Sequence, residues 1–284
     1  MKHVIITSSD EKYGDFLVEH WLRSLRANVK LDNIDIAVLD YGLSDTQRER
    51  LTSAGVLLCT ARPDGNITNV RYRDISDFLT RHDYDQVLSV DGGDIIFQSD
   101  ISHLFDQHKD TFRAVCEERE IPFHDVLLPQ TDMQRERYEE VFSFLKGKPT
   151  VNGGVVLGSA ERFKGLWNFF EQQCHNFDVF GTDQLVMNYL LYKTGFTRLD
   201  KKYNFAIVAM KARFLVDSGV FYDEHGEVIP IVHNAGMRSL TRCIKNFGYG
   251  KQCNKRKWLI PFLLHTLFAL INTFKTLRHQ SQNS

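Results

Sequence analysis

The sequence lacks carboxylates altogether at its C-terminal end. From residue 228 to residue 284 there is no Asp or Glu, while nine Lys and Arg side chains fall in the same stretch. The preceding 227 residues hold 26 basic and 36 acidic side chains, so the net charge of −1 conceals an acidic body and a basic end. This asymmetry indicates an anionic partner, for which a nucleotide diphosphate, anionic lipid headgroups and nucleic acid are the candidates.

Cysteine is scarce, and its spacing argues against two structural roles. The five cysteines are odd in number and no CxxC pair occurs, which disfavours both a disulfide framework and a zinc site. The first residues also lack the long apolar core of a signal peptide, and their apolar residues indicate a first strand instead. We therefore expect reduced thiols and a cytoplasmic protein.

The apolar run near the C-terminus is too short to cross a bilayer comfortably. It covers Trp258–Ile271, fourteen mostly apolar residues, whereas a spanning helix needs about 20. Its polar residues fall on one helical face and Lys255-Arg256-Lys257 precedes it, which is typical of an interfacial anchor. The alternative is a helix docked on the core or on a second subunit. We expect one domain over residues 1–250 and a basic tail over 251–284 that binds the inner face of an anionic membrane; its Leu and Phe content disfavours nucleic acid.

The body of the sequence alternates strand-like and helical segments. Apolar runs at Val4–Thr7, Ile34–Leu39 and Gln86–Val90 are separated by segments of helical periodicity, one of which begins with a capping-box pattern at Ser44 and Gln47. This alternation predicts an α/β fold with a mixed, mostly parallel central sheet flanked by helices. Ligands of such sheets bind beyond the carboxyl ends of the strands, so segments that directly follow strands are the first candidates for a site.

The strongest local signal is the segment Asp91-Gly92-Gly93-Asp94, which directly follows a predicted strand. Hard divalent cations prefer oxygen ligands, and the glycines permit close approach of a ligand. The same letters also suit a plain Asp-Gly hairpin turn. His233 follows the predicted strand Val228–Val232 and is a candidate third ligand, although a single histidine at a strand end is often structural.

Three further segments are candidates for ligand contacts. Asn152-Gly153-Gly154 offers an amide and backbone N–H groups, although a Gly-Gly pair is also typical of a turn. Thr182 is predicted to cap a helix, and Asp183-Gln184 behind it either favours the helix dipole or hydrogen-bonds sugar hydroxyls. Arg238, with Arg242 and Lys245 after it, is a candidate for phosphate oxygens, or else part of a solvated face.

Together these segments resemble the GT-A-fold glycosyltransferases, and most closely the family 8 retaining enzymes, which include bacterial lipopolysaccharide galactosyl- and glucosyltransferases and the glycogenins. The resemblance covers roughly residues 3 to 240 and rests on the order and spacing of five segments: Ser8–Tyr13, Asp91–Asp94, Asn152–Gly154, Asp183-Gln184 and His233–Gly236. It implies the Rossmann-like fold of nucleotide-diphospho-sugar transferases.

The resemblance also implies a role for each segment. Ser8, Asp10 and Tyr13 would bind the nucleotide; Asp91, Asp94 and His233 would hold Mn²⁺ or Mg²⁺; Asn152, Gly153, Gly154 and Arg238 would contact the donor; Asp183 and Gln184 would act beside the reacting carbon. Two positions depart from the family pattern. Gly93 stands where the second Asp of the Asp-x-Asp motif is expected, so Asp94 is its candidate replacement. Ser239-Leu240-Thr241 stands where Lys-Pro-Trp usually follows the histidine motif, so Arg238 or Arg242 would replace the lysine.

The implied activity is metal-dependent transfer of a hexose from a nucleotide-diphosphate sugar, with a UDP-sugar expected, to a glycan or glycolipid acceptor in lipopolysaccharide or surface polysaccharide synthesis. The broken Asp-x-Asp motif keeps open a catalytically degenerate protein of the same fold that binds a nucleotide sugar. An inverting reaction would need a carboxylate base, for which Glu117 and Glu118 are candidates. A nucleotidyltransferase is disfavoured because no Gly-rich loop follows the first strand, where the first glycine is Gly14.

Overall fold

A seven-stranded mixed sheet forms the centre of the protein. The computed structural model describes residues 2–118, 135–236, 242 and 244–256. Within them the strand order is β3-β2-β1-β4-β7-β6-β8, and every neighbouring pair is parallel except the two that β7 makes with β4 and β6. The strands are β1 (His3–Ser9), β2 (Ile34–Asp40), β3 (Leu57–Thr60), β4 (Gln86–Val90), β6 (Phe112–Cys116), β7 (Val151–Ser159) and β8 (Phe196–Arg198). The predicted mixed, mostly parallel sheet is confirmed.

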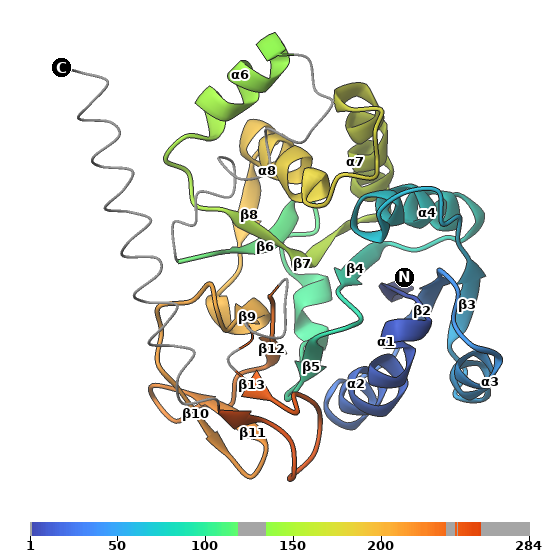
Figure 1. The fold of residues 1–284 in the computed structure, drawn as a ribbon, viewed down its shortest axis with the longest axis vertical. Helices are drawn as coiled ribbons and strands as arrows, with labels where there is room; N and C mark the ends of the chain where they lie inside the picture. The colour runs from blue at the N-terminus through green and yellow to red at the C-terminus, as the bar shows by residue number, and fades with distance from the viewer. Residues whose placement is uncertain (1, 119–134, 237–241, 243, 257–284) are drawn as a thin grey trace.

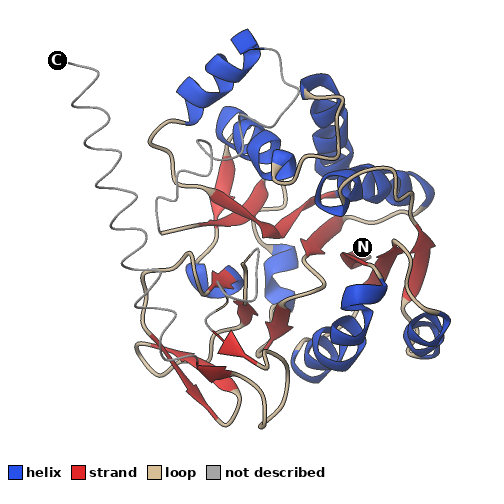
Figure 2. Ribbon diagram, viewed as in Figure 1, coloured by secondary structure: helices blue, strands red, loops and turns tan. Residues whose placement is uncertain are grey.

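Helices cover both faces of this sheet (Figures 1 and 2). Alternate residues of β1 point to opposite faces: Val4 and Ile6 join one apolar cluster, and Ile5 joins the other. Burial on both faces explains the unbroken apolar run from Val4 to Ile6 in this strand. The first face carries α4 (Ile67–Arg81), α7 (Ala160–Gln173) and α8 (Thr182–Thr194), with α6 (Arg135–Leu145) packed on α8; the second carries α1 (Glu11–Phe16), the π-helix η1 (Leu17–Leu22), α2 (Arg23–Asn28), α3 (Asp45–Ser53) and the 3-10 helix η2 (Ser102–Asp106).

A smaller sheet of order β5-β12-β9 stands at the carboxyl edge of the large one. The antiparallel pairing of β12 with β5 puts His233 opposite Ile95, so a residue far along the chain reaches the turn that follows β4. The remaining elements of this region are β5 (Ile95–Phe97), the 3-10 helix η4 (Lys201–Asn204), β9 (Phe205–Ala206), β10 (Phe214–Asp217), β11 (Val220–Asp223), β12 (Ile231–His233), β13 (Ile244–Lys245) and β14 (Lys255–Arg256).

Local sequence explains most of the boundaries and two of the wrong predictions. The capping box at Ser44 and Gln47 is present. The strand predicted over Val228–Val232 is wrong in its bounds, because Pro230 has no N–H and the pairing changes partner there, from β11 before it to β5 after it. The helix predicted to be capped by Thr182 is capped by Gly181, whose φ of +87° suits glycine.

Three predictions fall wholly or partly outside the described residues. The tail segment Trp258–Ile271 and Arg238 both lie there. Because most of the predicted tail is among these residues, the third prediction, a division of the chain at residue 250, stays a prediction. Within the described residues, no helix has both the length and the apolar character that a membrane crossing requires. Among the described residues, Cys59, Cys116 and Cys253 carry free thiols.

Candidate active site

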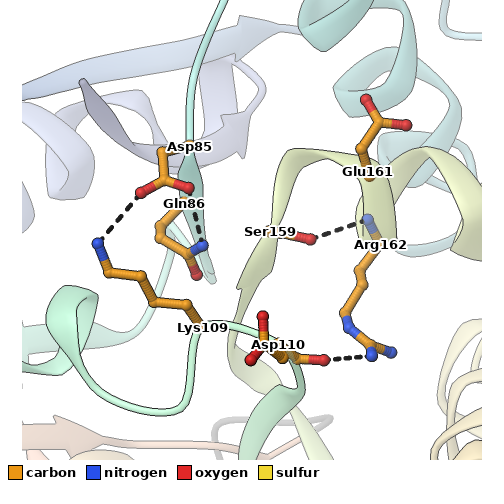
Figure 3. A pocket seen from close by; sticks show the side chains of 7 residues that line it. All are labelled: Asp85, Gln86, Lys109, Asp110, Ser159, Glu161 and Arg162. Carbon is orange, nitrogen blue, oxygen red and sulfur yellow. Dashed lines mark hydrogen bonds and ion pairs between the residues drawn. The ribbon is translucent and has the colours of Figure 1, made fainter. Parts of the chain in front are cut away.

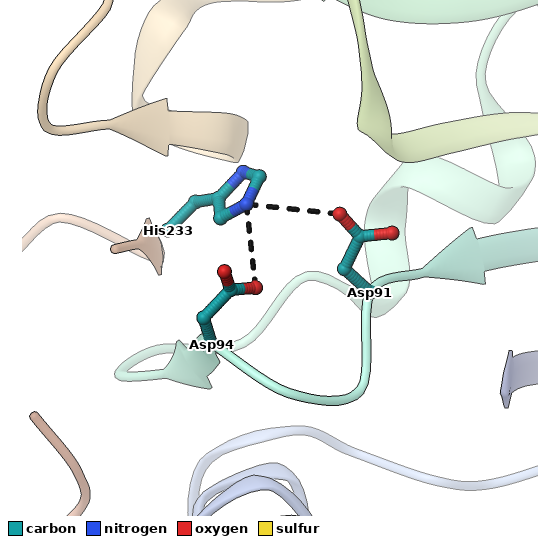
Figure 4. A group of neighbouring side chains, drawn as sticks. All are labelled: Asp91, Asp94 and His233. Carbon is teal, nitrogen blue, oxygen red and sulfur yellow. Dashed lines mark ion pairs between the residues drawn. The ribbon is translucent and has the colours of Figure 1, made fainter. Parts of the chain in front are cut away.

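Asp91, Asp94 and His233 form a cluster at the carboxyl edge of the central sheet (Figure 4). Asp91 directly follows β4, Asp94 directly precedes β5, and His233 ends β12, which pairs with β5. His233 Nε2 lies 3.7 Å from Oδ2 of Asp91 and 3.4 Å from Oδ1 of Asp94. The three predicted metal ligands are therefore neighbours in space.

The chemistry of this cluster fits a hard or borderline divalent cation. One ligand atom from each residue lies within 4.8 Å of the others. Two carboxylates and one imidazole are donors that suit Mn²⁺, and the carboxylates suit Mg²⁺. The other ring nitrogen of His233 is 3.0 Å from Oδ1 of Asn204, the kind of outer contact that orients a metal-binding histidine.

Positive charges balance the two carboxylates from both sides. Arg71 forms an ion pair with Asp91, and Arg242 Nη2 lies 3.0 Å from Oδ2 of Asp94. Burial raises the pKa of Asp94, but the charges of His233 and Arg242 outweigh burial and hold it below its usual value. Burial lowers the pKa of His233, and the neighbouring Asp94 and Asp91 outweigh this and raise it. The two carboxylates therefore attract positive charge to the space that Nε2 of His233 faces.

Arg71 is the central residue that the sequence analysis missed. It projects from α4 and is buried, and its Nη2 lies 3.4 Å from Oδ2 of Asp183 and 3.3 Å from the carbonyl oxygen of Gly153. It thus joins three predicted segments, those of Asp91, Gly153 and Asp183. One signal was available: Arg71 falls on the same helical face as the apolar Ile75 and Phe78, where a charged side chain is unexpected.

Asp183 lies on the first turn of α8 and is almost completely buried. Burial is the main reason that its pKa is raised to about 6, and the positive charge of Arg71 opposes this shift. The backbone N–H of Asp183 donates to Asn69 Oδ1, 2.9 Å away, on α4. Beside it, the buried Nε2 of Gln184 has no hydrogen-bond partner among the described residues, so this amide is available to a ligand.

The nucleotide-binding candidates of the first strand border the same turn. Asp10 caps α1 by accepting a hydrogen bond from the backbone N–H of Tyr13, 3.2 Å away. A Cβ atom added to Gly92 would lie 2.9 Å from the carbonyl oxygen of Ser8, and one added to Gly93 would lie 2.8 Å from the ring of Tyr13. The turn therefore passes so close to β1 and α1 that residues 92 and 93 have no room for side chains, and the second carboxylate stands at position 94.

Moving the second carboxylate to the position that the family motif expects should therefore harm this protein. We expect Gly93→Asp to lower the free energy of unfolding by about 1–3 kcal/mol, because the new Cβ overlaps the Tyr13 ring. Chemical denaturation measures this loss, and adding Tyr13→Ala should recover part of it. A Gly93→Asp protein as stable as the wild type would show that the turn has room for a side chain at position 93.

The segment Asn152–Gly154 lies inside β7, near its start. Because β7 is antiparallel, it begins at the edge where β4 ends, and Asp91 N donates to Gly154 O at 2.9 Å. A Cβ on Gly154 would lie 2.4 Å from Cε1 of His233. The absence of a side chain at Gly154 thus lets His233 approach the strand. Arg238 is the one predicted site residue outside the described part of the chain.

The two carboxylates considered as a base differ in their surroundings. Glu118 accepts hydrogen bonds from the backbone N–H groups of Lys211 and Ala212 and from Lys201, which ties it to a loop. Glu117 is buried, and burial raises its pKa, while Asn152 Nδ2 donates to it at 2.7 Å.

A hollow of about 610 Å³ lies elsewhere, at the other end of β4 (Figure 3). Its polar side chains are engaged with near neighbours: Lys109 with Asp85 at 3.2 Å, and Arg162 with the carbonyl oxygen of Asp110. It contains none of the predicted site residues, and we assign it no role in the chemistry.

Comparison with solved structures identifies the fold. The chain is similar to an apo structure of the bifunctional glycosyltransferase WbbM (TM-score 0.54, 16% identity, 84% of this chain and 46% of that one) and to the glycosyltransferase GlyE of Streptococcus pneumoniae TIGR4 (0.53, 19%, 88% and 58%). It is also similar to the galactosyltransferase LgtC in complex with donor and acceptor sugar analogues (0.51, 18%, 84% and 89%). The chain spans about half the length of the first two.

These likenesses show that the chain has the GT-A glycosyltransferase fold, which confirms the predicted fold class. The sequence itself matches no model of a known protein family and no curated protein. At identities below one fifth, shared architecture is what the comparison establishes.

Proposed function

We propose that this protein transfers a hexose from a nucleotide-diphosphate sugar, with a UDP-sugar as donor, to a glycan or glycolipid acceptor in a reaction that requires Mn²⁺ or Mg²⁺. The observation that carries the proposal is the cluster of Asp91, Asp94 and His233 at the carboxyl edge of a GT-A sheet. That edge is where open α/β sheets bind ligands. The complex of LgtC with donor and acceptor sugar analogues supports the same use of this fold.

Each side chain then has a task in donor binding. Ser8, Asp10 and Tyr13 hold the nucleotide beside the turn. Asp183 accepts hydrogen bonds from the sugar hydroxyls, and Gln184, whose Nε2 has no partner within the described residues, donates one to them. Arg71 keeps Asp91 and Asp183 at a fixed separation. A divalent cation held by Asp91, Asp94 and His233 would neutralise negative charge on the leaving diphosphate.

The positive residues after β12 assist the leaving group. Arg242 pairs with Asp94 at the rim of the cluster, from which it can turn toward phosphate oxygens, a geometry that guanidinium groups suit well. Arg238 is assigned the same task from sequence alone. Because Glu118 is tied to a loop and Glu117 to Asn152, we favour retention of configuration, in which the leaving phosphate takes the acceptor proton.

For the acceptor, the proposal rests on the sequence of the tail. Lys255-Arg256-Lys257 followed by an apolar run suits an anionic membrane surface, and hence a lipid-linked glycan or a growing lipopolysaccharide core. Co-sedimentation of the full chain with anionic vesicles, and not with neutral ones, is the expected result. If the chain sediments with neither kind of vesicle, the acceptor that remains is a soluble glycan.

A second candidate is a degenerate protein that binds a nucleotide sugar without turning it over. Its support is that Arg71 and Arg242 already neutralise the two carboxylates. Release of UDP from a panel of UDP-sugars, with and without Mn²⁺ and with detergent-solubilised glycolipid, separates the two. Turnover of one sugar that requires Mn²⁺ supports the transferase. Saturable binding with no turnover of any sugar supports the degenerate protein.

The raised pKa of Asp183 predicts a dependence on pH. The carboxylate is charged above about pH 6 and neutral below it, so donor turnover should fall as the pH is lowered through 6, when the attraction to Arg71 is lost. Asp183→Asn should have low turnover at neutral pH and no such acidic decline. Initial rates across a pH series measure both. An unchanged acidic decline in the variant would assign it to another group.

A further inference from the structure

A chain of hydrogen bonds runs from Glu117 through two buried amides to His233. Asn152 Nδ2 donates to Glu117 Oε1 at 2.7 Å, and Asn204 Nδ2 donates to Asn152 Oδ1 at 2.9 Å. The last link joins Asn204 Oδ1 to His233 Nδ1 at 3.0 Å. All four side chains are buried, and Asn204 is completely so. Asn204 ends η4 directly before β9 and was not among the residues predicted from the sequence.

The direction of these hydrogen bonds is fixed at one end by the backbone. Gly154 N donates to Asn152 Oδ1 at 2.9 Å, and a backbone N–H cannot exchange donor for acceptor. The amide of Asn152 must therefore point its nitrogen at Glu117 and its oxygen at Asn204. Asn204 then has to donate with its own nitrogen to that oxygen, which leaves its carbonyl oxygen for His233. Since this oxygen only accepts, the ring proton of His233 belongs on Nδ1.

Placing that proton on Nδ1 has a consequence for the other ring nitrogen. Nε2 faces Asp91 and Asp94, and with the proton held at Nδ1 a neutral ring directs its lone pair into this cluster. A second anchor fixes the geometry, because β9 pairs with β12 and places Ala206 beside His233. The alternative is that these amides only satisfy one another's hydrogen bonds in the core. In that case, replacing Asn204 would lower stability without a specific loss of cation affinity at the cluster.

We propose that Asn204 is a positioning residue for the divalent cation: it holds His233 in the Nδ1–H form and in the orientation in which Nε2 can act as a ligand. Asn152 and Glu117 set the direction of the Asn204 amide. The proposal rests on the cation site of the proposed function. Outer partners of metal-binding histidines affect metal affinity by about 10- to 100-fold, and this figure sets the size of the expected effect.

The test compares Mn²⁺ affinity with stability. In calorimetric titrations with Mn²⁺ alone, Asn204→Leu, which removes the acceptor at similar size, should weaken binding about 10- to 100-fold. Asn204→Asp keeps an acceptor for His233 and should bind Mn²⁺ about as well as wild type, even though it opposes Asn152 Oδ1 and lowers the melting temperature. The matched control is Gln86→Leu, which removes a buried amide acceptor of Arg113 at the far end of β4 and should lose stability without losing Mn²⁺ affinity.

A spectroscopic measurement on wild-type protein does not depend on the variants folding. Nitrogen NMR of the His233 ring, assigned by its absence from His233→Gln, should place the proton of the neutral ring on Nδ1. A proton on Nε2, or wild-type Mn²⁺ affinity in Asn204→Leu, would overturn the role of Asn204 alone. Failure of wild-type protein to bind Mn²⁺ would overturn the cation site itself, and with it the proposed function.

Discussion

Replacing Asp91 with Asn should reduce Mn²⁺-dependent turnover of the donor about 100- to 1,000-fold, the range seen when one preorganised charge-stabilising group is removed from an active site. The substitution keeps the size of the side chain and removes its charge. Asp91 faces both His233 Nε2 and Arg71, so the cluster would lose a ligand and Arg71 would lose one of its two carboxylate partners. UDP release with a saturating donor measures the rate, and calorimetry with Mn²⁺ measures the lost affinity.

The same strand provides a matched control for this substitution. Asp85 immediately precedes β4 and Asp91 immediately follows it. Asp85 pairs with Lys109 at the opposite edge of the sheet, away from every predicted site residue. Asp85→Asn should therefore keep both turnover and Mn²⁺ affinity. If Asp91→Asn retained wild-type turnover, or if both variants lost it equally, Asp91 would have no specific part in the reaction.

Much of the fold could be predicted from local sequence because it is encoded in short-range patterns. The strands β1, β2 and β4 are buried on both faces, so each contains a mostly apolar run that turn residues follow. The capping box at Ser44 needs only four consecutive residues. Pairing partners are not local in this sense. The exchange of partners at Pro230 depends on β5 and β11, and nothing in the predicted strand itself identifies them.

The same distinction divides the site. Asp91, Asp94 and His233 were predicted because each was placed at the end of a strand, and strand ends converge at one edge of the sheet. Arg71 and Asn204 sit inside or at the end of helices, and their importance comes from what faces them: Asp91 and Asp183 for Arg71, His233 for Asn204. Gly93 could be recognised only as a departure from a motif, since the Tyr13 ring that excludes a side chain there comes from another element.

Replacing Arg71 with Met should impair both folding and activity. The guanidinium is buried between Asp91 and Asp183, and removing one partner of a buried ion pair costs about 3–5 kcal/mol because the remaining charge is uncompensated. Asp91 is partly exposed, so we expect a loss near 3 kcal/mol in chemical denaturation, mostly from Asp183. The folded fraction should also turn over donor about 100-fold more slowly, since misplacing the two carboxylates by about 1 Å is enough for such a loss.

Arg73 separates the loss of a buried charge from the loss of this particular bridge. It lies two residues further along α4, is also largely buried, and pairs with Asp64 and Asp74 away from the cluster. Arg73→Met should be destabilised to a similar degree, yet its folded protein should keep wild-type turnover and Mn²⁺ affinity. Arg71→Lys keeps the positive charge, but an ammonium group cannot pair with Asp91 and Asp183 at once as the guanidinium does. Compared with Arg71→Met, it should therefore recover more stability than activity. Equal activity in folded Arg71→Met and Arg73→Met would mean that Arg71 stabilises the fold and takes no part in aligning Asp91 with Asp183.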